Sequence, residues 1–196
     1  MGTPPQSSVC GIVLAAGAGT RAGGPKSLLR TGDGTPWLEH ATTALLAGGC
    51  SRLVVVLGAM KRLARPLVPR DERITVIVAD DWESGMSASL RAGLAGASGC
   101  DAALVTLVDL PGLPAAVVGR LAAGAASGTL RQAVYGGRPG HPVLIGADHL
   151  VPAAATLNGD RGARAYLVEH GVDEIECGDL WDGHDLDYGI SGETPT

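Results

Sequence analysis

Four continuous apolar runs constrain the fold of this chain more than any other feature of its sequence. Each run is five to seven residues long and lacks the alternation of a half-exposed strand, as expected for strands covered on both faces of a parallel sheet. The runs span 9–14, 53–57, 74–78 and 102–108, and the predicted helices between and after them span about 37–47, 60–67, 87–95 and 114–123. This order predicts an α/β fold with three layers, in which a mostly parallel twisted sheet carries helices on both faces.

The last third of the chain has a different pattern. The elements predicted there are short strands over 131–135, 142–145 and 172–177, a glycine-rich link over 136–140 and a helix over 161–169. Asp160 is the expected N-cap of that helix. No linker, repeat or charge block divides the 196 residues, so we expect a single domain over 1–196, with 1–8 disordered.

Composition excludes several classes of protein. Hydrophobic residues make up 45% of the chain, yet no apolar run approaches the ~18 residues of a membrane span. No secretory signal is visible at the N-terminus, and four well-separated cysteines form no zinc or redox motif, so we expect a cytoplasmic protein with buried thiols. A net charge of −5 argues against a nucleic-acid partner.

A glycine-rich segment, AAGAGTRAGGPK, directly follows the first predicted strand and spans 15–26. Glycines at this place allow backbone N–H groups to converge on a phosphate. The spacing of Gly17, Gly19 and Ala22 fits a dinucleotide fingerprint, but that motif opens a helix at once, which the segment 23–25, Gly-Gly-Pro, disfavours.

Two further interpretations of this segment concern its cations. A Walker loop would place Gly24 directly before Lys26, but Pro25 separates them and lacks a backbone donor. The remaining interpretation is a loop that wraps a triphosphate, with Arg21 and Lys26 as fixed positive charges. A glycine-rich turn with two solvated cations is the alternative without a ligand.

A lone acid, Asp109, follows the apolar run 102–108 and precedes Leu110 and Pro111. Ligands of open α/β sheets bind beyond the carboxyl ends of the strands, and the glycine-rich loop lies at that same edge. A carboxylate that faces a triphosphate requires a divalent cation between them. We therefore predict that Asp109 binds Mg²⁺, while capping of the turn before Pro111 is the alternative.

Together these motifs resemble the signature of nucleotidyltransferases, L-A-A-G-x-G-x-R-x-G-x-P-K. Among them the chain is most similar to molybdenum cofactor cytidylyltransferases, relatives of the molybdopterin guanylyltransferases, and the further matches are WESGMSASL at 82–90, DLP at 109–111, GHP at 140–142 and GDRGAR at 159–164. The resemblance implies a Rossmann-like nucleotidyltransferase fold, with a nucleotide-binding part over 9–123 and an acceptor-binding part over 124–196. The nucleotide-binding residues that it implies are Leu14, Ala15, Ala16, Gly17, Gly19, Arg21, Lys26 and Ser89.

The resemblance also implies roles for residues outside the first loop. A serine before the helix at 87–95 is a good N-cap, and Ser89 is implied to contact the base or ribose. The family closes its metal site with a D-x-D-T-P-like motif; the segment 185–189, DLDYG, has its acids but not Thr-Pro. Asp187 is thus the implied second Mg²⁺ ligand and Asp185 the alternative, unless both belong to a solvated acidic tail.

Three residues are implied to bind the acceptor, namely His141, Asp160 and Arg164. His141 contacts the pterin or phosphate of the acceptor, or alternatively holds a loop through its ring N–H. Arg164 meets the acceptor phosphate or is a surface charge, and Asp160 is also explained as a helix cap.

The activity implied by the resemblance is Mg²⁺-dependent nucleotidyl transfer, with Arg21, Lys26 and Asp109 as catalytic residues. An acceptor phosphate attacks the α-phosphorus of an NTP and pyrophosphate leaves. CTP is favoured because Ala16 stands where guanylyl-transferring relatives often carry glycine, and molybdopterin is the expected acceptor, with hand-over to a molybdoenzyme or its chaperone. Transfer to a sugar phosphate or another small phosphomonoester, and a non-catalytic nucleotide-binding regulatory module, remain alternatives.

Overall fold

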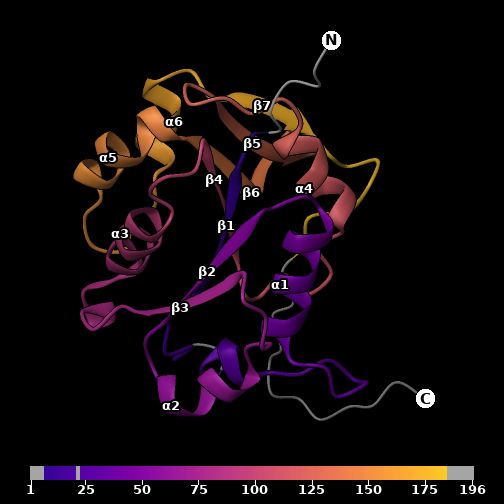
Figure 1. The fold of residues 1–196 in the computed structure, drawn as a ribbon, viewed down its shortest axis with the longest axis vertical. Coiled ribbons are helices and arrows are strands. Elements are labelled where there is room, and N and C mark those ends of the chain that lie inside the picture. The colour runs from indigo at the N-terminus through magenta and orange to yellow at the C-terminus, as the bar shows by residue number, and fades with distance from the viewer. Residues whose placement is uncertain (1–6, 21–22, 185–196) are drawn as a thin grey trace.

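The computed structural model describes residues 7–20 and 23–184 (Figure 1). Within these residues seven strands form one sheet in the order β3-β2-β1-β4-β6-β5-β7. The strands are β1 (Val9–Ala15), β2 (Arg52–Leu57), β3 (Ile74–Val78), β4 (Ala102–Leu107), β5 (Leu130–Tyr135), β6 (Arg138–Gly146) and β7 (Asp173–Glu176). Among the described strands only β6 runs antiparallel to its neighbours, β4 and β5. The mostly parallel sheet is confirmed.

Helices cover both faces of this sheet (Figure 1). They are α1 (Trp37–Ala47), α2 (Lys61–Ala64), α3 (Met86–Gly96), α4 (Ala115–Ala122), α5 (Ala147–Thr156) and α6 (Arg164–Glu169), with 3₁₀ turns η1 (Lys26–Leu28), η2 (Arg65–Leu67) and η3 (Trp82–Ser84). Helices α1 and α4 lie on one face, and α3, α5 and α6 on the other. No helix in the described part of the chain is long and apolar enough to cross a membrane.

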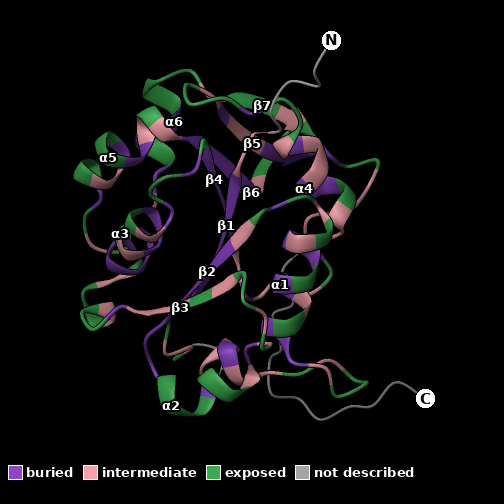
Figure 2. Ribbon diagram, in the orientation of Figure 1, coloured by how far each residue is buried: buried purple, intermediate pink, exposed green. Residues whose placement is uncertain are grey.

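The continuous apolar runs follow from this covering of both faces. Along β1, Val9 and Val13 pack toward α1 and α4, whereas Cys10 and Ile12 pack toward α3. Every residue of β1 is therefore buried, as Figure 2 shows for the central strands. All four cysteines lie in the described part of the chain and are buried and free, as expected.

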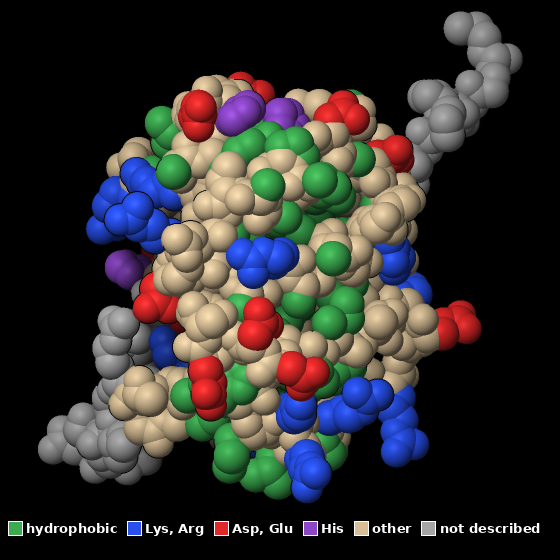
Figure 3. All heavy atoms as spheres, turned by 90° about the vertical axis from the view of Figure 1, so that its left-hand side faces the viewer, with side chains coloured by type: hydrophobic (Ala, Val, Ile, Leu, Met, Phe, Trp, Pro, Cys, Tyr) green, Lys and Arg blue, Asp and Glu red, His purple; other side chains and the backbone are tan. Residues whose placement is uncertain are grey.

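The face formed by α3, α5 and α6 is the one seen in Figure 3, where it carries both acidic and basic side chains and several basic side chains gather near the lower edge. Apolar side chains are also exposed on it, among them Met86 on α3, Val151 on α5 and Val168 on α6.

The local structure of the last third of the chain differs from the prediction in several places. Helix α5 was not predicted, because its Pro152 interrupts the helical pattern. Strand β6 begins at Arg138 rather than 142, so that the predicted link shrinks to Gly136 and Gly137. Both glycines have positive φ, 59° and 73°, as two-residue hairpin turns require.

The helix predicted over 161–169 is also shorter than expected. It begins at Arg164, and its N-cap is Ala163 rather than Asp160. The preceding residues form turns after Gly159, whose φ is 56°. Asp160 is therefore not a helix cap.

The sheet brings distant loops to one edge. Leu14 of β1 pairs with Leu107 of β4, and the Val108 N–H donates to the Leu14 carbonyl over 3.1 Å. The loop after β1 and the loop after β4 therefore begin side by side. Because β6 is antiparallel, its first residues, from Arg138 onward, lie at this same edge.

Candidate functional site

A backbone hydrogen bond closes part of the glycine-rich loop after β1, while the loop is open at Gly17. The Gly24 N–H donates to the Gly19 carbonyl over 3.1 Å. Gly19 has a φ of 61°, and a Cβ there would clash with the Gly24 carbonyl. At Gly17, by contrast, no described atom lies within 4 Å of the place that a Cβ would take. The loop thus offers exposed backbone at Gly17, while Arg21 lies outside the described residues.

Lys26 and Asp109 are in direct contact at this edge of the sheet. Lys26 begins the 3₁₀ turn η1, and its Nζ lies 2.9 Å from Asp109 Oδ2. The two side chains are only 21% and 17% exposed. Lys26 and Asp109 therefore lie together at the carboxyl edge of the sheet, and their charges face each other rather than solvent.

The second carboxylate oxygen of Asp109, Oδ1, is buried and has no hydrogen-bond partner among the described residues. Capping of the turn before Pro111 would occupy such an oxygen, so it does not explain this one. A buried carboxylate oxygen with unused lone pairs fits the oxygen donors that Mg²⁺ prefers. Asp185 and Asp187, the two implied partners of Asp109, lie outside the described residues.

His141 lies on β6 at the same edge, largely withdrawn from solvent. Its Nδ1 is 3.4 Å from the Val105 carbonyl oxygen, and its own carbonyl accepts a hydrogen bond of 2.7 Å from the Tyr135 hydroxyl. Burial lowers the pKa of His141, while the Val105 carbonyl and the negative charge of Asp109 oppose this shift. The net effect of burial is to favour the neutral form of the His141 imidazole.

The start of α3 meets the segment that carries Asp160. The Ser87 N–H donates to the Gly159 carbonyl over 3.0 Å. A Cβ on Gly85 would lie 2.5 Å from that carbonyl oxygen and 2.7 Å from Asp160 Oδ1. The two sequence motifs, one expected at the nucleotide and the other at the acceptor, are thus neighbours.

The structure places the other predicted residues of these motifs as follows. Gly85, not a serine, is the N-cap of α3, and Ser84 donates instead to the Asp81 carbonyl over 2.8 Å. Ser89 is buried within the helix. Arg164, at the first position of α6, is exposed.

Sequence reasoning missed the packing that supports the first loop. The Ala59 N–H donates to the Ala16 carbonyl over 2.9 Å. A Cβ on Gly58 would lie 2.7 Å from both the Ala16 oxygen and Trp82 Cγ. A glycine directly after β2, at the carboxyl edge, was the available signal for such a close approach.

The missed contacts also include the described end of the chain. Trp181 packs edge-on against Tyr135, with ring centroids 5.5 Å apart. A Cβ on Gly112, three residues after Asp109, would lie 3.4 Å from Trp181 Nε1. The chain after β7 therefore borders the loop that follows Asp109.

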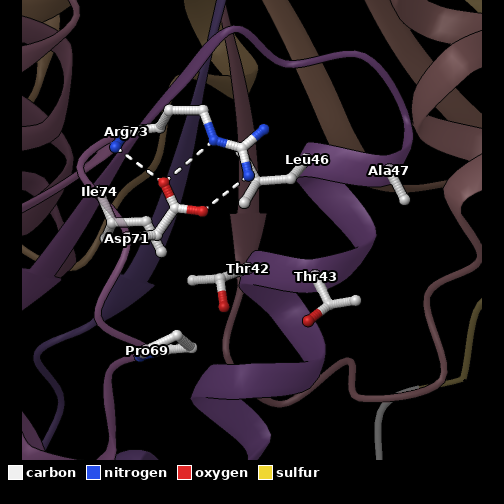
Figure 4. A pocket seen from close by; sticks show the side chains of 8 residues that line it. All are labelled: Thr42, Thr43, Leu46, Ala47, Pro69, Asp71, Arg73 and Ile74. Atoms are coloured by element: carbon white, nitrogen blue, oxygen red, sulfur yellow. Dashed lines mark hydrogen bonds and ion pairs between the residues drawn. The ribbon is translucent and has the colours of Figure 1, made fainter.

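Two shallow cavities lie beside α1, and neither is lined by Lys26 or Asp109. The one in Figure 4 has a volume of about 440 Å³ and lies between α1 and the segment 69–74. Its charged residues, Asp71 and Arg73, satisfy each other through hydrogen bonds of 3.0 and 2.6 Å. The second, of about 400 Å³, is lined by Glu39, His40 and Pro111, among others. The first cavity thus offers no unpaired charge to a ligand.

The matches to known proteins extend over most of the chain. The family model of the MobA-like NTP transferase domain matches residues 11–175. Nicotine blue oxidoreductase of Paenarthrobacter nicotinovorans is 40% identical in an alignment 199 positions long. The alignment covers 95% of this chain and 96% of the relative. A molybdenum cofactor guanylyltransferase of Burkholderia ambifaria is 31% identical over 91% of both chains, and the molybdenum cofactor cytidylyltransferase of Escherichia coli is 26% identical over 89% of both.

A solved structure shares this architecture. A nucleotidyl transferase from Methanothermobacter is 26% identical, with a TM-score of 0.72 over 86% of this chain and 87% of that one. The range matched by the family model includes Gly17, Lys26, Asp109 and His141, and it ends before Asp185 and Asp187.

Proposed function

This chain belongs to the family of MobA-like NTP transferase domains, and we propose that it transfers a nucleoside monophosphate from an NTP to a phosphorylated small molecule. The observation that carries the proposal is the contact of Lys26 with Asp109, at the edge of the sheet where the loop with the open backbone of Gly17 also begins. A cation, a carboxylate and exposed backbone N–H groups together suit a metal-bound polyphosphate. The alternative of two solvated cations fits poorly with a Lys26 side chain that is only 21% exposed.

The proposed nucleotidyl transfer requires positioning of the substrates and stabilisation of negative charge, and it requires no covalent enzyme intermediate. The attacking group is a phosphate, already ionised near neutral pH, so that no general base is needed. Lys26 stabilises negative charge on the α-phosphoryl group and on the departing pyrophosphate, and Arg21 is proposed to share this task. Backbone N–H groups of 15–19 hold the β- and γ-phosphates, which the absent side chain of Gly17 allows to approach.

Asp109 is the proposed Mg²⁺ ligand, because its buried Oδ1 has no partner among the described residues. Bound there, Mg²⁺ would neutralise the charge between the carboxylate and the phosphate oxygens. We propose Asp187 as the second protein ligand, with Asp185 as the alternative. Asp109 also keeps Lys26 at the site through their 2.9 Å ion pair.

The proposed acceptor is molybdopterin, because relatives of this chain are named for transfer to the molybdenum cofactor. His141, Asp160 and Arg164 are its proposed contacts. A neutral His141 beside Asp109 can share hydrogen bonds with a phosphate or a pterin without adding a charge. The proposed preference for CTP rests on Ala16, while identity is 31% to a guanylyltransferase and 26% to the cytidylyltransferase, so all bases enter the test.

A second candidate follows from the relative that is 40% identical, whose name is nicotine blue oxidoreductase. On this alternative the chain reduces nicotine blue or a similar dye with electrons from a dinucleotide. The pyrophosphate of the dinucleotide would then occupy the glycine-rich loop, where Gly17 leaves backbone exposed.

One set of reactions separates these functions. The protein is incubated with Mg²⁺, molybdopterin and each of the four NTPs in turn, and product mass and pyrophosphate are measured. A parallel set replaces molybdopterin with a sugar 1-phosphate, and another contains NADH or NADPH with nicotine blue. The Asp109→Asn variant is the control throughout.

The proposal expects a product heavier than molybdopterin by one nucleotidyl group, that is, by a nucleoside monophosphate less one water, together with pyrophosphate, and neither with Asp109→Asn. Oxidation of NADH or NADPH without pyrophosphate release would contradict the proposed nucleotidyl transfer and favour the oxidoreductase function. Binding of an NTP without any product from either acceptor would instead favour a regulatory module.

A further inference from the structure

The carboxylate of Glu176, the last residue of β7, binds three backbone N–H groups. Its Oε1 accepts hydrogen bonds from Gly136, over 3.1 Å, and from Gly178, over 2.7 Å, and its Oε2 accepts one from Gly137, over 3.3 Å. We propose that Glu176 is a positioning residue for the acceptor side of the site, an inference that rests on the proposed function. The arrangement of Glu176 with these three glycines is called the clasp below.

The topology explains why Glu176 reaches this turn. Strands β5 and β7 are parallel, and Val134 pairs with Glu176. The carboxylate therefore lies beside the turn of the β5–β6 hairpin, formed by Gly136 and Gly137. The hydrogen bonds from Gly178 and Gly136 are the main causes that lower the pKa of Glu176, so that the group stays ionised at neutral pH.

The turn end of this hairpin has few ladder contacts of its own. The β5–β6 register shifts between Gln132 and Val134, and beyond that shift the pairs are Val134 with Pro139 and Tyr135 with Arg138. Pro139 has no N–H to give to the ladder. Three hydrogen bonds to one carboxylate therefore add to the few ladder pairs that hold this end in place.

The hairpin carries residues toward the reacting groups. Beyond Pro139, β6 continues to His141, whose carbonyl accepts a 2.7 Å hydrogen bond from the Tyr135 hydroxyl. His141 also contacts β4, the strand that leads to Asp109, since its Nδ1 lies 3.4 Å from the Val105 carbonyl oxygen. A tilt of the turn would thus move His141 relative to Asp109, since rigid strands transmit such a displacement over a few residues.

The clasp also fixes the chain that follows β7. Gly178, its third donor, leads to Trp181, which packs against Tyr135. Arg120 donates to the Glu176 carbonyl over 2.8 Å and is ion-paired with Asp179. One side chain thus connects the hairpin, which carries His141, with the segment that borders the loop after Asp109.

The test is the Glu176→Gln variant, which keeps one acceptor oxygen and turns the other into an NH₂ donor facing backbone N–H groups. Its matched control is Asp71→Asn. Asp71 is likewise a carboxylate that accepts a backbone N–H, from Arg73 over 2.9 Å, but it lies beside the far edge strand β3. Turnover is measured with molybdopterin and the NTP that supports it, together with hydrogen exchange at Gly136 and Gly137 and the melting temperature.

We expect Glu176→Gln to raise the KM for molybdopterin roughly five- to tenfold, as a sub-ångström misplacement can. The KM for the NTP and kcat should change less than about twofold, and exchange at the turn should accelerate. Asp71→Asn should leave every kinetic constant unchanged. A variant with a lower melting temperature but an unchanged KM for molybdopterin would reduce Glu176 to a structural role and overturn the proposal.

Failure of the proposed function is seen separately, as absence of pyrophosphate release from the wild type. In that case the role of the clasp is tested by equilibrium dialysis with molybdopterin. The proposal predicts that molybdopterin binds more weakly to Glu176→Gln than to the wild type. Equal dissociation constants, or no binding to either protein, would overturn it.

Discussion

Replacement of Gly17 by alanine separates the stability of the fold from the binding of a phosphate. No described atom lies within 4 Å of the place that the added Cβ would take, and the φ of Gly17 lies outside the left-handed region. The methyl group therefore meets no protein atom among those described. Fewer backbone states in the unfolded chain should stabilise the variant by about 0.4–1 kcal/mol, which raises the melting temperature by roughly 1–4 °C.

The same methyl group should weaken nucleotide binding. In the proposed complex a phosphate oxygen takes this space and accepts a hydrogen bond from the loop backbone. Displacing it removes a hydrogen bond to a charged group, worth about 1.5–3 kcal/mol, so that affinity should fall roughly 10- to 150-fold. Melting curves and calorimetric titration with Mg²⁺ and the NTP measure the two effects.

Gly32→Ala is the matched control. No described atom lies within 4 Å of the place that a Cβ on Gly32 would take, and Gly32 lies outside the first loop. It should change stability in the same way as Gly17→Ala and leave nucleotide affinity unchanged. If Gly17→Ala binds the NTP as tightly as the wild type, the phosphates do not lie over Gly17 and the reasoning about the loop is refuted.

Two further predictions concern other contacts of the fold. Gly85→Ala should lower the free energy of unfolding in urea by about 2–4 kcal/mol, because its φ is 114° and the new Cβ would lie 2.5 Å from the Gly159 oxygen; a loss below about 0.5 kcal/mol would contradict this packing. Because the pKa of Glu176 is lowered on folding, its contribution to stability is fully present above the ordinary value of 4.5 and is lost as the pH falls through the folded value. The difference in melting temperature between the wild type and Glu176→Gln should therefore be constant from pH 5 to 7 and shrink below about pH 4, and a difference that grows on acidification would exclude this linkage.

The parallel half of the fold could be predicted from the sequence because its signals are local. The apolar run of β1 is buried on both faces, and the predicted helix 37–47 has the bounds of α1. Since carboxyl ends of parallel strands meet at one edge, the sequence also predicted that the first loop and Asp109 face one another, and Lys26 Nζ lies 2.9 Å from Asp109 Oδ2.

The antiparallel half could not be predicted as well, because its structure depends on pairing between distant segments. Strand β6 enters the sheet between β4 and β5, and that placement brings His141 against Val105 of β4. Prolines at 139 and 142 concealed the full length of the strand. The clasp was invisible because the partners of Glu176 are backbone N–H groups, which carry no sequence signal.

The central claim is that Asp109 and Lys26, already paired with each other over 2.9 Å, bind a metal-bound polyphosphate beside their ion pair, and metal-dependent nucleotide binding tests it most directly. Titration of the wild type and of Asp109→Asn with the NTP, in Mg²⁺ and in EDTA, gives four dissociation constants. The account predicts that Mg²⁺ strengthens binding to the wild type by roughly tenfold or more, about 1.4 kcal/mol, and does not strengthen binding to Asp109→Asn. The same gain from Mg²⁺ in both proteins, or no gain in the wild type, would contradict it.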